Sequence, residues 1–201
     1  NMNANEVISN FAIKKLKGVI GSKKPVHPND HVNLSQSSND TFPTVMHIAC
    51  NELIENKLIK SIKNLNKELK IKSEKFKNII KIGRTHTQDA TPITLGQEFS
   101  GYCKQISNNK KRLEEAKKEL VYLAQGATAV GTGINAPKNF DKIFCQYLSK
   151  LTKSKYLPSS NKFESIASHD SMVNLSGCLN TIAVTLMKIS NDIRFLGSGP
   201  R

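Results

Sequence analysis

The sequence predicts an all-α protein in which long helices form a bundle. The clearest signal is a series of apolar residues, spaced three and four positions apart, that continues for roughly seven helical turns over residues 172–196. Two further long segments show helical spacing, and each exceeds the usual length of a globular helix. Only residues 79–82 have a strand-like pattern. We therefore expect at most one very short hairpin or strand, near residues 79–83.

The expected helices follow in order along the chain. A short helix covers residues 3–17, and two long ones carry the apolar positions of residues 54–69 and 102–123. Another short helix, at residues 139–153, precedes the last long one. We call the apolar positions of that last helix the apolar seam: Met172, Leu175, Leu179, Ile182, Leu186, Ile189, Ile193 and Leu196. A seam of this kind packs against other helices.

The charge is strongly basic, with 30 Lys and Arg against 16 Asp and Glu, a formal net charge of +14. Such a balance is typical of proteins that bind nucleic acid or anionic membranes. However, 26 of the 30 basic residues are Lys, whereas phosphate and base recognition favours Arg. Trp is absent and only 6% of residues are aromatic, so few side chains could stack on bases. The charge therefore indicates mainly a Lys-rich composition, and the nine Lys of residues 57–81 indicate a solvated helix face.

The remaining composition favours a cytoplasmic protein. No run of eighteen apolar residues occurs, and the first residues lack the pattern of a signal peptide. The four cysteines lie far apart in the sequence and form no Cys-x-x-Cys pair. We expect them to be reduced and mostly buried: Cys50, Cys103, Cys145 and Cys178.

The first polar loop, residues 24–43, combines helix-capping residues with two histidines. Ser38, Asn39 and Asp40 are all competent N-caps, and Pro43 suits a first helical turn. With Ser37 they form a larger polar cluster than one cap requires, which favours a carboxylate or phosphate site, although plain capping stays open. His27 and His31 have metal-ligand spacing only if they are helical. Because Pro28 argues against a helix and no third ligand is near, we expect no metal.

Two later loops complete the candidate chemistry. His86 stands between two threonines in residues 81–92, and an imidazole can transfer a proton near neutral pH. The alternative is a loop histidine bonded to backbone carbonyls. The glycines of residues 126–133 follow a predicted helix rather than a strand, which excludes a dinucleotide loop and favours close passage beside helices or a ligand. The residues alone thus predict a helical bundle with a polar anion-binding cleft.

Long motifs in these loops resemble one family. They are residues 1–7, 26–43, 81–98, 126–135, 161–164 and 186–201. Together they resemble class II fumarate hydratases of the aspartase/fumarase superfamily, and the similarity covers essentially the whole chain. The resemblance implies that residues 1–201 are the central helical domain of a longer protein. It also implies reversible hydration of fumarate to (S)-malate in the tricarboxylic acid cycle, through proton abstraction and an aci-carboxylate intermediate, without a metal or organic cofactor.

The resemblance assigns roles residue by residue. Ser37, Ser38, Asn39 and Thr85 would hold the substrate carboxylates, and His86 would donate and accept a proton through a water molecule. The family's second anion site matches His27, Pro28, Asn29 and Asp30, with Lys24 as its cationic partner.

The resemblance also implies parts that this chain does not include. The mobile serine loop with the carbon base and the C-terminal domain would follow Arg201, a Ser-Gly-Thr segment would precede Asn1, and the acidic partner of His86 would lie outside. The family forms homotetramers whose active sites combine three subunits. Because the base and part of the carboxylate-binding site would be absent, the 201 residues alone are expected to be inactive.

Two rival functions stay open at this stage. Aspartate ammonia-lyases share much of the pattern, but they usually have Thr in place of Ser38 and Gln in place of His86. A non-catalytic basic helical scaffold, or a nucleic-acid-binding protein, is the alternative from another class.

Overall fold

The computed structural model describes residues 1–199, and the end of the predicted similarity, at Pro200 and Arg201, lies outside this range. The chain forms two compact units, each built from two stretches of sequence. Unit 1 contains residues 1–52 and 119–170, and unit 2 contains residues 53–118 together with the chain from Ser171 onward.

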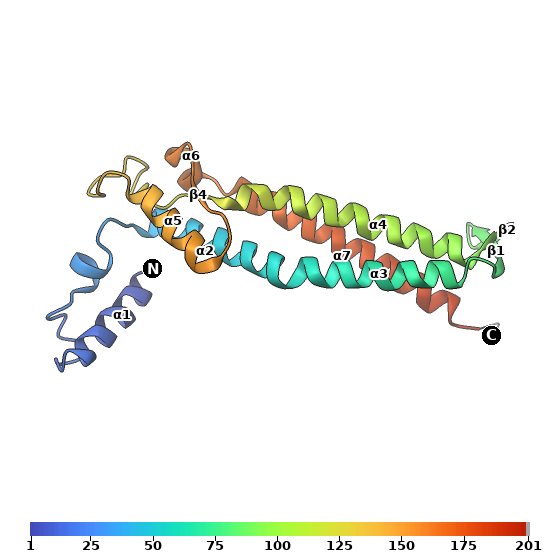
Figure 1. The fold of residues 1–201 in the computed structure, drawn as a ribbon, viewed down its shortest axis with the longest axis horizontal. Coiled ribbons are helices and arrows are strands. Elements are labelled where there is room, and N and C mark those ends of the chain that lie inside the picture. Colours follow the sequence, from blue (N-terminus) through green and yellow to red (C-terminus); the bar gives the residue numbers. More distant parts are fainter. Residues whose placement is uncertain (200–201) are drawn as a thin grey trace. The chain divides into compact units, whose positions relative to one another are not determined.

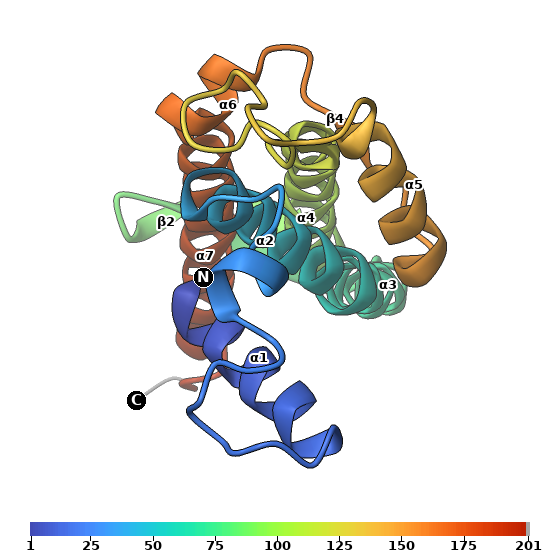
Figure 2. The same cartoon turned by 90° about the vertical axis from the view of Figure 1, so that its left-hand side faces the viewer.

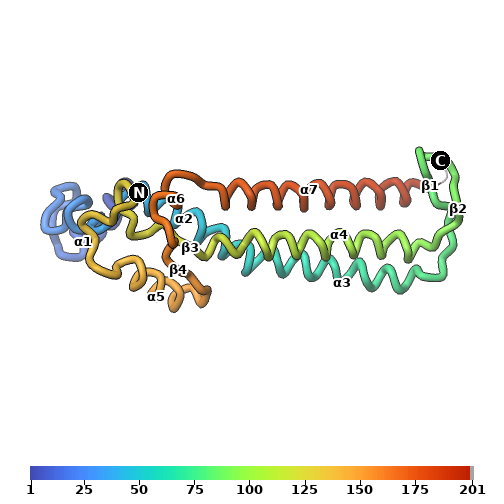
Figure 3. Tube along the Cα trace, turned by 90° about the horizontal axis from the view of Figure 1, so that it is seen from above, coloured from blue at the N-terminus to red at the C-terminus, as the bar shows by residue number. Residues whose placement is uncertain are grey.

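Unit 2 is a bundle of three long helices. α3 (Ile59–Lys75), α4 (Leu95–Ala116) and α7 (Asp170–Leu196) run side by side (Figures 1 and 3). A π-helical turn, η2 (Ile54–Leu58), leads into α3. Eight lysines of α3 and its flanks are exposed, as predicted for a solvated face. The buried apolar residues of the unit are Ile54, Ile59, Ile62, Leu69, Tyr102, Ile106, Leu113, Ala116, Leu175, Ile182 and Ile189. The all-α prediction of long bundled helices is thereby confirmed.

The apolar seam of α7 is covered on one side only. Leu175, Ile182 and Ile189, seven residues apart, are at most 5% exposed. The alternate seam positions Leu186 and Ile193 are 36% and 43% exposed. Of the helices in residues 1–199, α7 is the one that is long and apolar enough to cross a membrane, a property that core helices of soluble proteins share. Half of the seam therefore lacks a partner within its own unit.

A β-hairpin connects α3 with α4 in unit 2. β1 (Ile80–Thr85) pairs with the antiparallel β2 (Gln88–Thr94), and α4 follows directly (Figure 1). At this junction Thr94 Oγ1 accepts the N–H of Gln97, whose side chain accepts the N–H of Thr94, which is a capping box. The strands extend beyond residues 79–83, where they were expected. β2 lacks an alternating apolar pattern because most of it is solvent-exposed, so periodicity could not reveal it.

Unit 1 is built from shorter elements. α1 (Met2–Lys15) lies beside the segment that carries η1 (Pro28–Val32), as Figure 2 shows, and α2 (Ser38–Leu53) follows. A 3-10 turn, η3 (Lys117–Val121), ends the helix predicted for residues 102–123. The later elements are β3 (Tyr122–Leu123), α5 (Phe140–Thr152), β4 (Leu157–Pro158) and α6 (Lys162–Ala167).

The core of unit 1 lies where α5 meets a small parallel strand pair. Leu123, Cys145 and Tyr156 form its buried centre. β3 and β4 pair through two residues each, which is too short to give a period-two pattern in the sequence. This second strand pair was therefore not predicted.

Two smaller expectations are wrong. Pro43 is the sixth residue of α2 rather than part of its first turn, because the helix already begins at Ser38. All four cysteines are free, as predicted, but only Cys145 is buried. The other three are partly exposed because they lie on helix flanks: Cys50, Cys103 and Cys178.

Candidate functional site

The first turn of α2 presents the predicted polar cluster of unit 1. Ser37 Oγ accepts the N–H of Asn39 at 3.2 Å, and Asp40 Oδ1 accepts the N–H of Ser37 at 2.9 Å. These reciprocal bonds resemble a capping box and set the start of the helix. The backbone N–H groups that begin a helix point outward and carry partial positive charge, so the turn can bind an anion.

A polar cavity of about 380 Å³ opens beside this turn. The residues that line it are Asn29, Asp30, Asn33, Leu34, Ser35, Gln36, Ser37, Ser38, Thr128, Ala129, Ile134 and Asn135. The structure thus brings two groups of predicted residues onto one cavity, Asn29 and Asp30 with Ser37 and Ser38. Hydroxyl, amide and backbone N–H groups around such a space can hold the oxygens of a carboxylate.

Asn39 takes a different position from its serine neighbours. Its side-chain Nδ2 donates to the backbone oxygen of Ala129 at 2.7 Å, and Asn39 does not line the cavity. The amide therefore connects α2 to the opposite wall of the cavity.

The turn η1 orders the predicted second anion site. His27 Nδ1 accepts the N–H groups of Asn29 and Asp30, each at 3.2 Å. The expectation that Pro28 opposes a helix is wrong, because proline at the first helical position needs no N–H and its fixed φ suits the turn. His31 Nδ1 in turn accepts the N–H of His27 at 2.8 Å.

These histidine bonds direct both Nδ1 atoms to the backbone of their own turn. Within residues 1–199, no group of three His, Cys, Asp or Glu side chains is placed to hold a metal ion. Lys24, the predicted cationic partner, is exposed and does not line the cavity.

The glycine-rich segment 126–135, which we call the wall loop, forms the other side of the cavity. Gly126 and Gly131 have positive φ angles of 91° and 98°. A Cβ atom on Gly126 would lie 2.8 Å from the Asp141 side chain, and one on Gly131 would lie 2.6 Å from Phe163. Both glycines thus allow close passage beside α5 and α6, as the sequence predicted.

The wall loop also contributes site residues that the sequence analysis did not single out. Thr128, Ala129 and Asn135 line the cavity, and Ser35 Oγ donates to the backbone oxygen of Asn135. Their sequence signals were their place beside the glycines and their place in the motif of residues 126–135, to which no roles were assigned residue by residue.

Thr85 and His86 belong to unit 2, at the tip of the hairpin. Thr85 pairs with Gln88, so His86 and Thr87 form a two-residue turn in which both φ angles are positive, 52° and 62°. Turns of this kind favour Asn and Gly, and a β-branched threonine with positive φ is strained. Strain of this sort is common at functional sites. At this turn the His86 side chain is exposed to solvent.

Two contacts hold the base of this hairpin. Lys81 forms an ion pair with Glu98 of α4, and the guanidinium of Arg84 lies 5.3 Å from the ring centre of Phe195 on α7. A sheet irregularity between Ile82 and Arg84 places Gly83 so close to Thr91 that a Cβ would lie 2.6 Å from its backbone oxygen. Contacts with α4 and α7 in unit 2 therefore hold β1, the strand that leads to His86.

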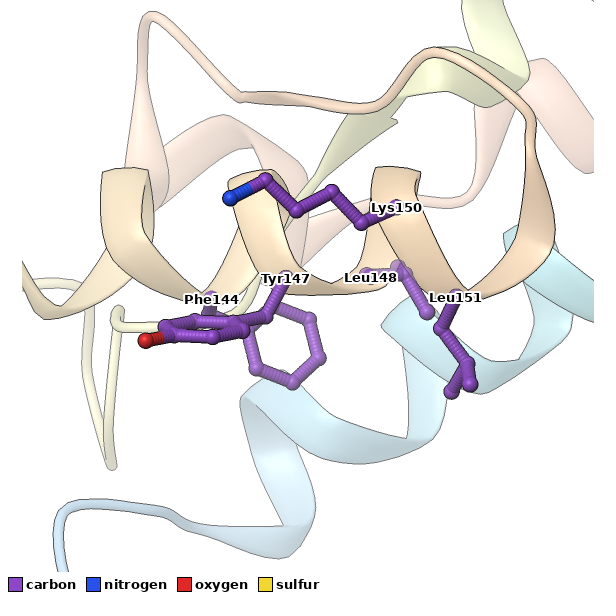
Figure 4. Close-up of a pocket in the computed structure, with 5 residues that line it drawn as sticks. All are labelled: Phe144, Tyr147, Leu148, Lys150 and Leu151. Atoms are coloured by element: carbon purple, nitrogen blue, oxygen red, sulfur yellow. The ribbon is translucent and has the colours of Figure 1, made fainter.

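A larger cavity in unit 1 has a different character. About 540 Å³ of space lies along α5, lined by Phe144, Tyr147, Leu148, Lys150 and Leu151 (Figure 4). Its lining is mainly apolar and includes none of the candidate site residues found in the sequence. It is therefore not the candidate site.

Known proteins match the whole of this chain. The family model described as lyase matches residues 1–201. Class II fumarate hydratase of Caulobacter vibrioides is 60% identical over 201 residues, which are 100% of this chain and 43% of that protein. Mitochondrial fumarate hydratase of Schizosaccharomyces pombe is also 60% identical, and the match covers 39% of its length. The chain therefore spans less than half of these relatives.

A solved structure shows the same fold. The class II fumarase of Schistosoma mansoni matches 100% of this chain and 45% of its own, with a TM-score of 0.95 and 44% sequence identity. Its helical architecture agrees with the bundle expected from the sequence.

Proposed function

Since the chain belongs to the lyase family, whose model matches all of its residues, we propose that it supplies part of the active site of a class II fumarate hydratase. The observation that carries the proposal is the polar cavity at the start of α2, where the Ser37–Ser38 turn faces the η1 turn. A dicarboxylate needs hydroxyl, amide and N–H donors that are fixed before charge develops in the reaction. The names of the similar proteins, which are fumarate hydratases, support fumarate as that dicarboxylate, and malate would be its hydration product.

The proposed reaction adds water across the double bond of fumarate to give (S)-malate. In the reverse direction a base removes a C3 proton from malate, an aci-carboxylate carries the resulting charge, and the C2 hydroxyl leaves with a proton. Ser37, Ser38, Asn39 and Thr85 would bind the carboxylates, while His86 would donate and accept the proton through a water molecule. The base would come from residues outside this chain.

The second anion site would be a separate function of the η1 turn. His27, Pro28, Asn29 and Asp30 shape this turn, and Lys24 would attract an anion toward it. Such a site would bind a dicarboxylate before it reaches the cavity. No cofactor is needed for this chemistry, because proton transfer and charge stabilisation are both functions of side chains.

The proposal includes a homotetramer with shared active sites. It is supported by the uncovered half of the apolar seam on α7, where Leu179 and Ile193 are 39% and 43% exposed. A second helix with the same seam would bury these residues. We further propose a cytoplasmic location, although two of the related enzymes, from yeasts, are named mitochondrial.

The test is turnover by the full-length protein that contains these 201 residues. We expect fumarate to be consumed, as measured by its ultraviolet absorbance, and no ammonia to be released from aspartate. His86→Asn should lower kcat by about 10²-fold or more, as removal of a general acid–base does. Its matched control is His31→Asn, because His31 lies outside the proposed catalytic residues and bonds only its own turn.

Three outcomes would contradict the proposal. Release of ammonia from aspartate would identify the protein as an ammonia-lyase. Activity within a few-fold of normal in His86→Asn would leave His86 a structural residue. Inactivity together with DNA binding that weakens steeply with salt would favour the nucleic-acid-binding alternative.

A further inference from the structure

One buried carboxylate lies between the two walls of the polar cavity. Asp40, in the first turn of α2, is 0% exposed and therefore cannot touch a ligand in the cavity. A buried carboxylate is costly unless hydrogen bonds satisfy it. The hydrogen-bond partners of Asp40 therefore indicate its structural role.

Both oxygens of this carboxylate accept hydrogen bonds, and they do so from different walls. Oδ1 accepts the N–H of Ser37 at 2.9 Å and the hydroxyl of Thr41 at 3.3 Å, both on the α2 side. Oδ2 accepts the N–H of Gly126 at 3.1 Å and that of Thr128 at 2.8 Å, both on the wall loop. One side chain thus joins the serine turn to the wall loop.

The wall loop needs such a contact because its backbone is strained at one residue. Thr128, which is β-branched, has a φ of 56°, whereas a glycine adopts the φ of 91° found at Gly126 without strain. A strained residue keeps its conformation only when surrounding contacts hold it there. Asp40 provides such contacts by accepting the N–H groups of Thr128 and of Gly126, two residues before it.

We propose that Asp40 is a positioning residue that sets the separation of the two walls and thereby the affinity of the cavity for a carboxylate. This inference rests on the proposed function, since it takes the cavity as the substrate site. Asp40 acts through Ser37 on one wall and through Thr128 and Ala129 on the other. It neither binds the substrate nor transfers a proton.

The test substitutes Asp40→Asn in the full-length protein. The asparagine side chain has nearly the same shape as aspartate. Its NH₂ group cannot accept a hydrogen bond, and it would face two donors on either wall, so the bonds to one wall are lost. We expect the KM for fumarate to rise about tenfold or more, with a smaller change in kcat, because at least one charge-assisted bond is lost. Amide hydrogen exchange at Gly126 and Thr128 should also become at least about tenfold faster.

The control is Asn51→Ala, at the other end of α2. Asn51 is 3% exposed, and its Nδ2 donates to the Tyr156 hydroxyl at 2.9 Å, away from the cavity. This variant should lower the thermal midpoint without changing KM or exchange in the wall loop. A general loss of stability in unit 1 is thereby separated from a specific loss at the cavity.

The outcomes distinguish this inference from the proposed function. If the unmodified protein does not act on fumarate, the proposed function fails, and exchange at Gly126 and Thr128 still decides the role of Asp40. Unchanged exchange and KM in Asp40→Asn would overturn the inference. If that variant does not fold, hydrogen exchange in Asn39→Ala decides. This substitution removes the side-chain bond to Ala129 but leaves Asp40 and its bonds in place, so Gly126 and Thr128 should stay protected, and complete loss of their protection would overturn the inference.

Discussion

Single residues in unit 1 derive their positions from bonds to backbone groups. His27 accepts two N–H groups of its own turn, Ser37 accepts one at the start of α2, and Asp40 accepts three from two segments. Bonds of this kind fix a side chain without a large apolar contact area. They therefore suit a polar cavity, where an apolar core could not hold the walls.

His47 is a half-buried residue whose ionisation should affect stability. Burial lowers the pKa of its imidazole below the ordinary value of 6.5, although a bond to the Tyr122 backbone oxygen at 2.9 Å opposes the shift. Among its charged neighbours, His169 lowers the pKa, whereas Glu119 and Glu164 raise it. The folded protein thus prefers the neutral ring more strongly than the unfolded chain does.

The consequence is a loss of stability in acid. Above the unfolded pKa both states are neutral, and His47 adds no pH dependence. As the pH falls through about 6.5 the unfolded chain binds a proton first, so the free energy of unfolding decreases until the lowered folded pKa is passed. Urea unfolding at several pH values measures this, and His47→Gln should show a smaller decrease between pH values of about 7 and 5. An equal decrease in both proteins would assign the effect to other groups.

Whether a site residue can be predicted from the sequence depends on whether its contacts are with neighbours in the sequence or with distant residues. Ser37 and Ser38 could be identified because several cap residues stand together, and the structure places both on one cavity. Asp40 was identified only as a possible cap, since its two bonds to the wall loop join residues more than eighty positions apart. Contacts of that range leave no local pattern in a sequence.

Among the elements, α7 combines a covered and an uncovered face. The buried seam positions Leu175, Ile182 and Ile189 pack within unit 2, and the uncovered half of the seam carries Leu179, Leu186 and Ile193, which are 39%, 36% and 43% exposed. Contiguous apolar surface of this kind is typical of an interface. The three-four spacing predicted the helix, but it could not show which half of the seam a neighbour covers.

We expect this uncovered face to form the interface of the proposed homotetramer. Leu186→Lys places a charge on it, and burying an unpaired ammonium there is unfavourable. In the full-length protein the variant should elute from size exclusion as a smaller species. Asn191→Lys, at an exposed polar position on the opposite side of the same helix, serves as the control for added charge. Unchanged assembly of Leu186→Lys would place the interface elsewhere.

The hairpin shows why elements with weak patterns are missed. Ile80 and Ile82 gave a signal for β1, whereas β2 is held by backbone pairing and by the capping box at Thr94. Those interactions depend on the partner strand and on the following helix. The apolar periodicity of one short segment gives no information about the partner strand or the following helix.

For the whole molecule, the main finding is that the predicted site residues divide between the two units. The Ser37–Ser38 turn and the η1 turn belong to unit 1, and Thr85 and His86 belong to unit 2. Relatives are more than twice as long as this chain, which spans 43% of the class II fumarate hydratase of Caulobacter vibrioides. By our proposal, a complete site therefore needs residues of both units and of more than one chain.

We therefore expect the 201-residue polypeptide, expressed alone, to hydrate no fumarate. The substrate-binding turn would be present, but the base that removes the C3 proton would be missing, and general base catalysis is worth about 10²-fold or more. The absorbance assay used for the full-length protein provides the measurement, and circular dichroism would verify that the polypeptide is helical. Robust turnover by this polypeptide would show that the base lies among its own residues.

The two-residue turn at His86 and Thr87 has a further consequence for sequence change over evolution. In a hairpin, adding or removing one residue shifts the register and turns every later side chain to the opposite face. Here that shift would move Thr85 away from its pairing with Gln88 and displace the junction with α4. Related genes should therefore keep the length of this hairpin constant, even where residues other than Thr85 and His86 change.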